Sequence, residues 1–196
     1  PGSPAMGMLS AMSTSSSSSS SSIAQCAYIE VPLSWSDAPS VNQPKINVFV
    51  KKLSARKSPV IGQLWLLNGG PGLGGNSLDQ MATVLRNALV NYDIMIPDQR
   101  GTARSSFLEC ETGDFDSSDM DLVSACWSNL QSTYGSSLHD WGTTSAAKDV
   151  LYLQSITKPN DDSIFAAYGV SYGSFLLVCN RVSPLNSVKL VVCLLL

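Results

Sequence analysis

From residue 45 onward, short apolar segments with strand character alternate with segments that have the periodicity of an α-helix. In the segment 45–53, Ile46, Val48 and Val50 occupy every second position, as in a strand with one buried face. In the segment 76–91, apolar residues recur at spacings of three and four, as along one face of a helix. Such alternation predicts an α/β fold, with a mainly parallel sheet covered by helices on both faces.

The expected elements follow one order: two leading strands, then strand, helix, strand, helix, strand, helix and strand. A turn that contains Pro39, Ser40 and Pro44 separates the leading strands, and a long loop with one or two short helices reaches about residue 140. Thr143 or Thr144 is expected to cap the second main helix. The expected strands are 27–31, 45–53, 64–67, 93–97, 164–168 and 188–195, and the main helices are 76–91, 143 or 144 to 156, and 171 to about 182.

Composition excludes several classes of function. The net charge is −3 and no block of Lys or Arg occurs, which argues against a nucleic-acid partner. The most apolar run, 188–196, contains Lys189 and is far shorter than the roughly 20 residues that cross a bilayer. We therefore expect no nucleic-acid partner and no membrane span, and a small organic or peptide substrate fits better.

Residues 1–23 differ from the rest of the chain, because they are of low complexity and include an unbroken serine run from Ser15 to Ser22. Such a segment has little apolar surface to bury, so we expect a disordered tail or linker. The folded domain is expected to occupy residues 24–196.

The five cysteines, an odd number, do not define a disulfide framework. Cys110 and Cys126 lie in a region rich in Asp, Ser and Gly, where a bridge would restrain a long connection. The alternative is free thiols, which suits Cys179 and Cys193 in their apolar runs. A Cys110–Cys126 bridge would favour an oxidising compartment, and hence a secreted or endolysosomal protein; a cytoplasmic location is the alternative.

The segment 169–173 reads Gly-Val-Ser-Tyr-Gly and lies between an expected strand and an expected helix. A serine hydroxyl reaches a carbonyl carbon only if a sharp turn lifts it clear of the sheet, and small flanking residues allow that turn. This context favours Ser171 as a nucleophile over a simple tight turn.

The segment 68–72, Asn-Gly-Gly-Pro-Gly, follows the buried strand 64–67. Backbone N–H groups that stabilise an oxyanion need close access to the substrate, which glycines permit. We expect one donor from the N–H of Tyr172 and the other from Gly70 or its neighbour Gly69. A phosphate-binding loop is disfavoured because no Lys follows in the required place, and a flexible surface loop fits the preceding buried strand less well.

A third loop, 98–105, begins with Asp98-Gln99-Arg100-Gly101 and contains Arg104. Arg100 or Arg104 is expected to pair with Asp98 and hold this loop beside the glycine loop. A structural ion pair is favoured over a catalytic role for Asp98.

Together these motifs resemble the proline iminopeptidase and tripeptidyl aminopeptidase group of α/β-hydrolases, the S33-type serine peptidases. The segments 26–33 and 143–149 are also similar to that group, and the resemblance covers about residues 24–182. Asn68 stands where many members have His, and the similarity decays after Phe175. The resemblance implies an α/β-hydrolase fold and a serine peptidase that removes residues from peptide N-termini through an acyl-enzyme at Ser171. It also implies a small peptide or ester substrate, with no metal and no cofactor. An esterase or lipase-like enzyme, or a non-catalytic pseudo-enzyme or binding module, is the alternative.

Ser171 would need an acid and a base, which in this fold follow it in the order Asp or Glu, then His. No Asp, Glu or His follows Ser171, and the single histidine, His139, precedes it and is expected to be exposed. The cap that would read the substrate is also absent, and the chain begins at Pro1. We therefore expect an inactive fragment, the N-terminal part of the domain, truncated after about the sixth strand. Its last strand would expose an apolar edge, so poor solubility is also expected.

Overall fold

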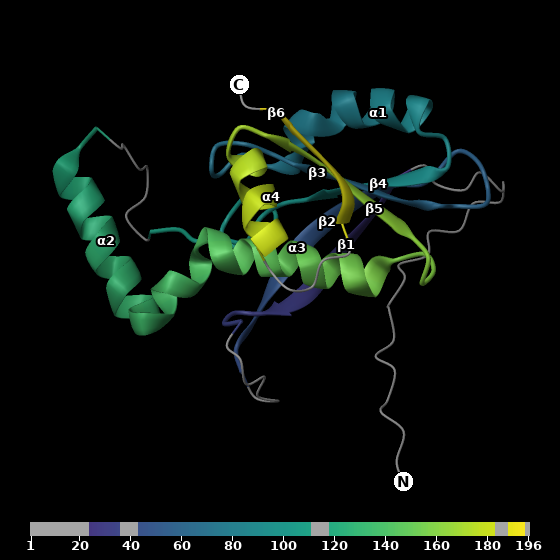
Figure 1. Ribbon diagram of the computed structural model, residues 1–196. Helices are drawn as coiled ribbons and strands as arrows, with labels where there is room; N and C mark the ends of the chain where they lie inside the picture. Colours follow the sequence, from purple (N-terminus) through teal and green to yellow (C-terminus); the bar gives the residue numbers. More distant parts are fainter. Residues whose placement is uncertain (1–23, 36–42, 111–117, 183–187, 195–196) are drawn as a thin grey trace, which may run out of the picture.

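The computed structural model describes residues 24–35, 43–110, 118–182 and 188–194. The serine-rich tail expected at 1–23, and most of the turn expected around Pro39 and Ser40, lie outside these residues. Within them the chain forms one sheet with helices on both of its faces (Figure 1).

The sheet has six strands in the order β1-β2-β4-β3-β5-β6. The two leading strands pair antiparallel, and β2 pairs antiparallel with β4. The remaining neighbours, β4–β3, β3–β5 and β5–β6, are all parallel. The mainly parallel α/β sheet predicted from the alternation is thus confirmed. The strands are β1 Ala24–Pro32, β2 Lys45–Leu53, β3 Gly62–Leu67, β4 Tyr92–Pro97, β5 Ile164–Val170 and β6 Val188–Leu194.

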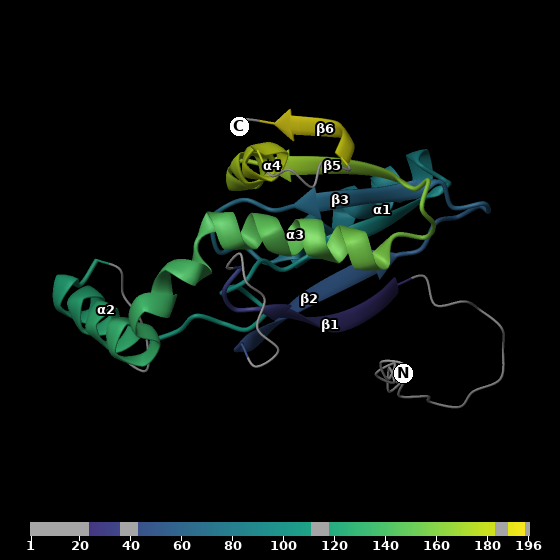
Figure 2. The same ribbon diagram turned by 60° about the horizontal axis from the view of Figure 1, so that its bottom comes forward.

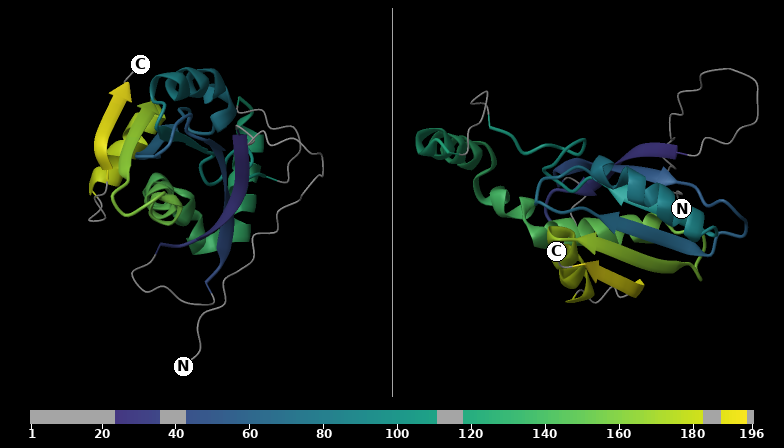
Figure 3. Two further views of the ribbon diagram at one scale, coloured as in Figure 1. Left: turned by 90° about the vertical axis from the view of Figure 1, so that its right-hand side faces the viewer. Right: turned by 90° about the horizontal axis from the view of Figure 1, so that it is seen from above.

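The helices lie in two layers. Helix α1 covers one face of the sheet, whereas α3 and α4 cover the other (Figure 3). Helix α2 projects beyond the end of the sheet (Figure 2). The helices are α1 Asp79–Ala88, preceded by a 3-10 turn η1 Gly75–Leu78, then α2 Met120–Tyr134, a 3-10 segment η2 Gly135–Trp141, α3 Thr143–Thr157 and α4 Tyr172–Val182. None of the helices within the described residues is long and apolar enough to cross a membrane.

The central strand β3 contributes side chains to two apolar clusters, one on each face of the sheet. All six of its residues are buried. Trp65 and Leu67 point toward α3 and α4 and join the larger apolar cluster. Leu64 and Leu66 point to the opposite face and pack beneath α1. A strand buried on both faces places its carboxyl end in the interior of the fold, where ligands of parallel sheets bind.

Two elements differ from their predictions. The one or two short helices expected before about residue 140 are α2 and the 3-10 segment η2, but α2, with 15 residues, is longer than a short helix. Its length was underestimated because Asp, Ser and Asn, which favour turns and caps, interrupt its apolar positions, and none of its residues is fully buried. The helix α3 begins as predicted, but the residue at its N-cap is Gly142 and no side chain caps it. Neither Thr143 nor Thr144 acts as the expected cap.

Candidate functional site

Ser171 lies at the junction of β5 and α4, where the sequence predicted a sharp turn. Its backbone φ is 50°, a left-handed conformation that residues other than glycine rarely adopt. The carbonyl of Ser171 accepts a hydrogen bond from the N–H of Ser174 at 2.8 Å, which closes the first turn of α4. The Ser171 side chain is exposed. The turn therefore presents a hydroxyl to solvent at the carboxyl end of a central strand.

The two glycines that flank this turn are required by close backbone contact. A Cβ atom on Gly173 would lie 2.1 Å from the carbonyl oxygen of Leu67, at the end of β3. A Cβ atom on Gly169 would lie 2.6 Å from the carbonyl carbon of Gly173. Helix α4 thus starts directly against β3 and the glycine loop that follows it.

The glycine loop lies beside Ser171. A Cβ atom on Gly69 would lie 3.2 Å from the Cβ atom of Ser171 and 3.7 Å from its Oγ atom. The next residue, Gly70, has a φ of 109°, which excludes most other residues. The loop and the serine hydroxyl are therefore brought together as the sequence predicted, while the role of each group in catalysis stays a prediction.

Asn68 holds the glycine loop in place. Its Nδ2 atom donates to the carbonyl of Gly74 at 2.7 Å and to the Oγ atom of Ser77 at 2.6 Å. Its Oδ1 atom accepts from the N–H of Gly69 at 2.8 Å. Because the Gly69 N–H is already engaged, Gly70 is the better of the two candidate oxyanion donors.

Asp98 is buried and pairs with Arg104. Its Oδ2 atom accepts from the Nε atom of Arg104 at 2.7 Å, and this hydrogen bond raises the pKa of Arg104 above its ordinary value. The guanidinium also lies over the ring of Phe49, 3.9 Å from its centroid. The Oδ1 atom of Asp98 accepts from the N–H of Gly75 at 2.6 Å. Asp98 therefore joins its own loop to the end of the glycine loop, as expected of a structural carboxylate.

Arg100, the other candidate partner of Asp98, pairs with Asp149 in α3 instead. Its Nε and Nη2 atoms donate to the two carboxylate oxygens at 2.7 and 2.5 Å. Its Nη1 atom donates to the carbonyls of Leu33 and Asp140 at 2.6 and 2.7 Å. The guanidinium is fully buried and holds the end of β1, the 3-10 segment η2 and α3 together.

Sequence reasoning missed this network, although Asp149 lies on the buried side of α3. The indole Nε1 of Trp35 also donates to Asp149, at 2.8 Å. Burial raises the pKa of Asp149, while its hydrogen bonds from Arg100 and Trp35 act in the opposite direction. A carboxylate amid the apolar positions of a helix is the sequence signal that indicates a buried partner.

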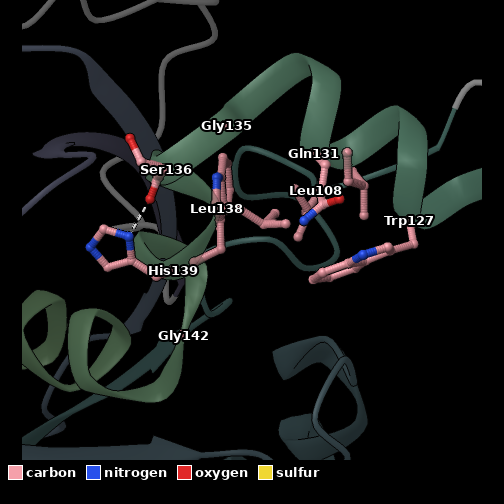
Figure 4. A pocket seen from close by; sticks show the side chains of 10 residues that line it. Leu108, Trp127, Gln131, Gly135, Ser136, Leu138, His139 and Gly142 are labelled. Atoms are coloured by element: carbon pink, nitrogen blue, oxygen red, sulfur yellow. Dashed lines mark hydrogen bonds between the residues drawn. The ribbon is translucent and has the colours of Figure 1, made fainter.

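His139 lies in η2, and its side chain is 76% exposed, as expected. Its Nδ1 atom contacts the carbonyl of Ser136 (Figure 4). Its Nε2 atom lies 3.4 Å from the carboxylate of Asp140. It borders an open groove of about 510 Å³, together with Trp127, Leu138 and neighbouring residues of α2 and η2. Within the described residues no hydrogen bond joins His139 to Ser171, so its contacts are those of a surface residue.

Cys110 and Cys126 form the disulfide that the sequence left open, with Cα atoms 5.2 Å apart. The bridge joins the loop after β4 to α2. Cys26 and Cys179 are free thiols. In the described part of the chain, no group of three or more His, Cys, Asp or Glu side chains is arranged to hold a metal ion.

Comparison with solved structures finds proteins with the same arrangement of strands and helices. A probable hydrolytic enzyme from Pseudomonas aeruginosa matches with a TM-score of 0.55 and 12% identity, over 86% of this chain and 40% of that one. A lipase in its open form matches with a TM-score of 0.51 and 14% identity, over 86% of this chain and 44% of the lipase. The proline iminopeptidase of Mycobacterium smegmatis matches with a TM-score of 0.48 and 13% identity, over 84% of this chain and 42% of that one.

The chain thus spans about two fifths of the length of these solved structures. No protein-family model and no functionally curated protein matches the chain. At these identities the likeness to the hydrolytic enzyme and the lipase shows a shared fold and does not select one activity.

Proposed function

We propose that this chain, whose fold is that of the α/β-hydrolases, carries the nucleophile half of a serine hydrolase. Ser171 is the proposed nucleophile, and the backbone N–H groups of Tyr172 and Gly70 are the proposed oxyanion donors. Asp98, Arg100 and Arg104 hold the surrounding loops and take no part in the chemistry.

One observation carries this proposal: Ser171 has a left-handed backbone and the glycine loop lies against its side chain. A strained non-glycine residue persists only where the surrounding structure holds it. The strain turns the hydroxyl outward at the end of β5, and the amides at the start of α4 favour negative charge nearby. If this turn had only a structural role, a glycine at position 171 could form it without backbone strain.

In the proposed reaction the Oγ atom of Ser171 attacks the carbonyl carbon of an amide or ester. The carbonyl oxygen becomes an oxyanion that accepts hydrogen bonds from the two backbone N–H groups. A general base must take the hydroxyl proton and pass it to the leaving amine or alcohol as the oxyanion collapses and the C–N or C–O bond breaks. Water then attacks the acyl-enzyme, releases the acid product and returns the proton to Ser171. No Asp, Glu or His follows Ser171 among these 196 residues, so the proposal includes an acid and a base that are supplied from outside this sequence.

The finer proposal is a peptidase that removes residues from peptide N-termini. Its support is the similarity of the segments 68–72, 98–105 and 169–173 to the iminopeptidase and tripeptidyl aminopeptidase group. An esterase is the second candidate, because the same turn and oxyanion loop serve esters. The Cys110–Cys126 bridge supports a secreted or endolysosomal location.

Labelling with a fluorophosphonate probe tests the nucleophile. Protein made from the longest reading frame that contains this sequence should be labelled at Ser171, and the Ser171→Ala variant should not. The 196-residue chain alone should stay unlabelled, because its serine has no base. If the reading frame ends at Leu196 and Ser171 does not react, the protein is a non-catalytic binding module and the proposal fails.

The choice between peptidase and esterase is tested on the labelled protein. Chromogenic amides with a free N-terminal Pro or Ala, the same amides with a blocked N-terminus, and short acyl esters should be compared by kcat/KM. An aminopeptidase should prefer the free N-terminus over the blocked one. Hydrolysis of the acyl esters alone would favour the esterase.

A further inference from the structure

Tyr172 follows the proposed nucleophile and contributes more to the site than its backbone N–H. Its side-chain hydroxyl lies 2.7 Å from the Oγ1 atom of Thr143, the first residue of α3. The two residues are 29 positions apart in the sequence, so this hydrogen bond is a tertiary contact between the starts of two helices. The aromatic ring of Tyr172 also packs at 6.3 Å from that of Phe175, one turn further along α4.

The hydroxyl of Thr143 does not cap the helix that begins at this residue. A threonine at the start of a helix commonly serves as an N-cap, with its oxygen accepting from a backbone N–H. In α3 the N-cap position belongs to Gly142, and no side-chain cap hydrogen bond is formed. The helix therefore begins without a side-chain cap, while the Thr143 hydroxyl bonds to Tyr172 instead.

Thr143 is a firm attachment point because α3 is held rigidly. Ala146 and Ala147 are buried in the larger core, one turn after Thr143. Asp149 fixes the same helix through its buried pair with Arg100. A hydroxyl on such a helix can hold a partner in one position more precisely than a hydroxyl on a loop.

We propose that Thr143 is a positioning residue for the site at Ser171. Its hydroxyl holds the side chain of Tyr172, and thereby the orientation of the peptide group between Ser171 and Tyr172. That peptide group carries the N–H proposed to stabilise the oxyanion, and its direction decides how well the N–H meets the developing charge. This inference rests on the proposed function of Ser171.

The test uses the full-length protein that a fluorophosphonate probe labels at Ser171. The limiting rate of labelling, kinact, and the half-saturation concentration, KI, should be measured for Thr143→Val, Thr143→Ser and Tyr172→Phe. Thr144→Val is the matched control, because its side chain is exposed and adjacent. Thermal unfolding of each variant is recorded. Labelling is then measured at a temperature well below the unfolding midpoint of every variant.

We expect Thr143→Val and Tyr172→Phe each to lower kinact by about 10- to 100-fold with KI unchanged. The double variant should be no slower than the slower single variant, because both changes remove the same hydrogen bond. Thr143→Ser should restore labelling to within about 3-fold, since it keeps the hydroxyl. Thr144→Val should label like the unmodified protein.

Two results would overturn the inference alone: labelling of Thr143→Val at the rate of Thr144→Val, or a loss that Thr143→Ser does not repair. The second result would mean that the methyl group and packing matter, and not the hydroxyl. Absence of labelling in the unmodified protein would instead refute the proposed function, and the inference with it.

Discussion

Arg100, in the loop after β4, and Asp149, in the middle of α3, form a buried ion pair with two hydrogen bonds of 2.7 and 2.5 Å. The pair joins the loop beside the proposed oxyanion site to the helix whose first residue contacts Tyr172. Because the Arg100 guanidinium also donates to backbone carbonyls of Leu33 and Asp140, it holds the surroundings of the site together.

Replacing Asp149 by Asn should strongly destabilise the protein. The guanidinium of Arg100 would keep its charge in a fully buried position without a carboxylate, at a cost of about 3–5 kcal/mol. Urea unfolding followed by tryptophan fluorescence measures this loss. Asp161→Asn is the matched control, because its ion pair with Lys158 is exposed, and it should change stability far less. Equal effects of the two changes would contradict the structural role of the buried pair.

Replacing Gly173 by Ala should separate α4 from β3. The added Cβ atom would meet the carbonyl oxygen of Leu67 at 2.1 Å, and this backbone atom moves only with its strand. We expect a loss of about 1–3 kcal/mol in the free energy of unfolding, together with loss of Ser171 labelling in the full-length protein. Gly142→Ala serves as the control, because its added Cβ atom would approach a carbonyl only to 3.2 Å. A Gly173→Ala protein of unchanged stability would show that the helix can shift without cost.

Reduction of the Cys110–Cys126 disulfide should loosen α2 and leave the sheet intact. None of the residues of α2 is fully buried, so the bridge is a main restraint on the helix, and closing a loop of this size contributes about 3 kcal/mol. Hydrogen exchange should accelerate in residues 120–134 of the double variant Cys110→Ser, Cys126→Ser, while β3 and β5 stay protected. Cys26→Ser, which changes a free thiol, is the control. Uniform acceleration across the sheet would mean that the bridge supports the whole domain.

Much of the fold follows from the sequence because its signals are local. The strand β2 has the bounds that its alternating pattern predicts, and the other strands and main helices occur in the predicted order. The turn at Ser171 was also predictable, since its requirements are a preceding strand, a following helix and two nearby glycines. By contrast, α2 has only a partly buried face, which includes Leu122, Cys126 and Leu130, and none of its residues is fully buried, so its sequence carries a weaker signal.

The sequence alone thus determined the strand and helix order and the residues that end the strands, because these depend on neighbours within a few positions. Only the tertiary structure decided which of those residues pair. Arg104 and not Arg100 contacts Asp98, the Gly69 N–H is held by Asn68, and Thr143 contacts Tyr172 instead of capping α3. Each choice depends on which side chains the packed sheet and helices bring within hydrogen-bond distance, and a sequence pattern does not encode that distance.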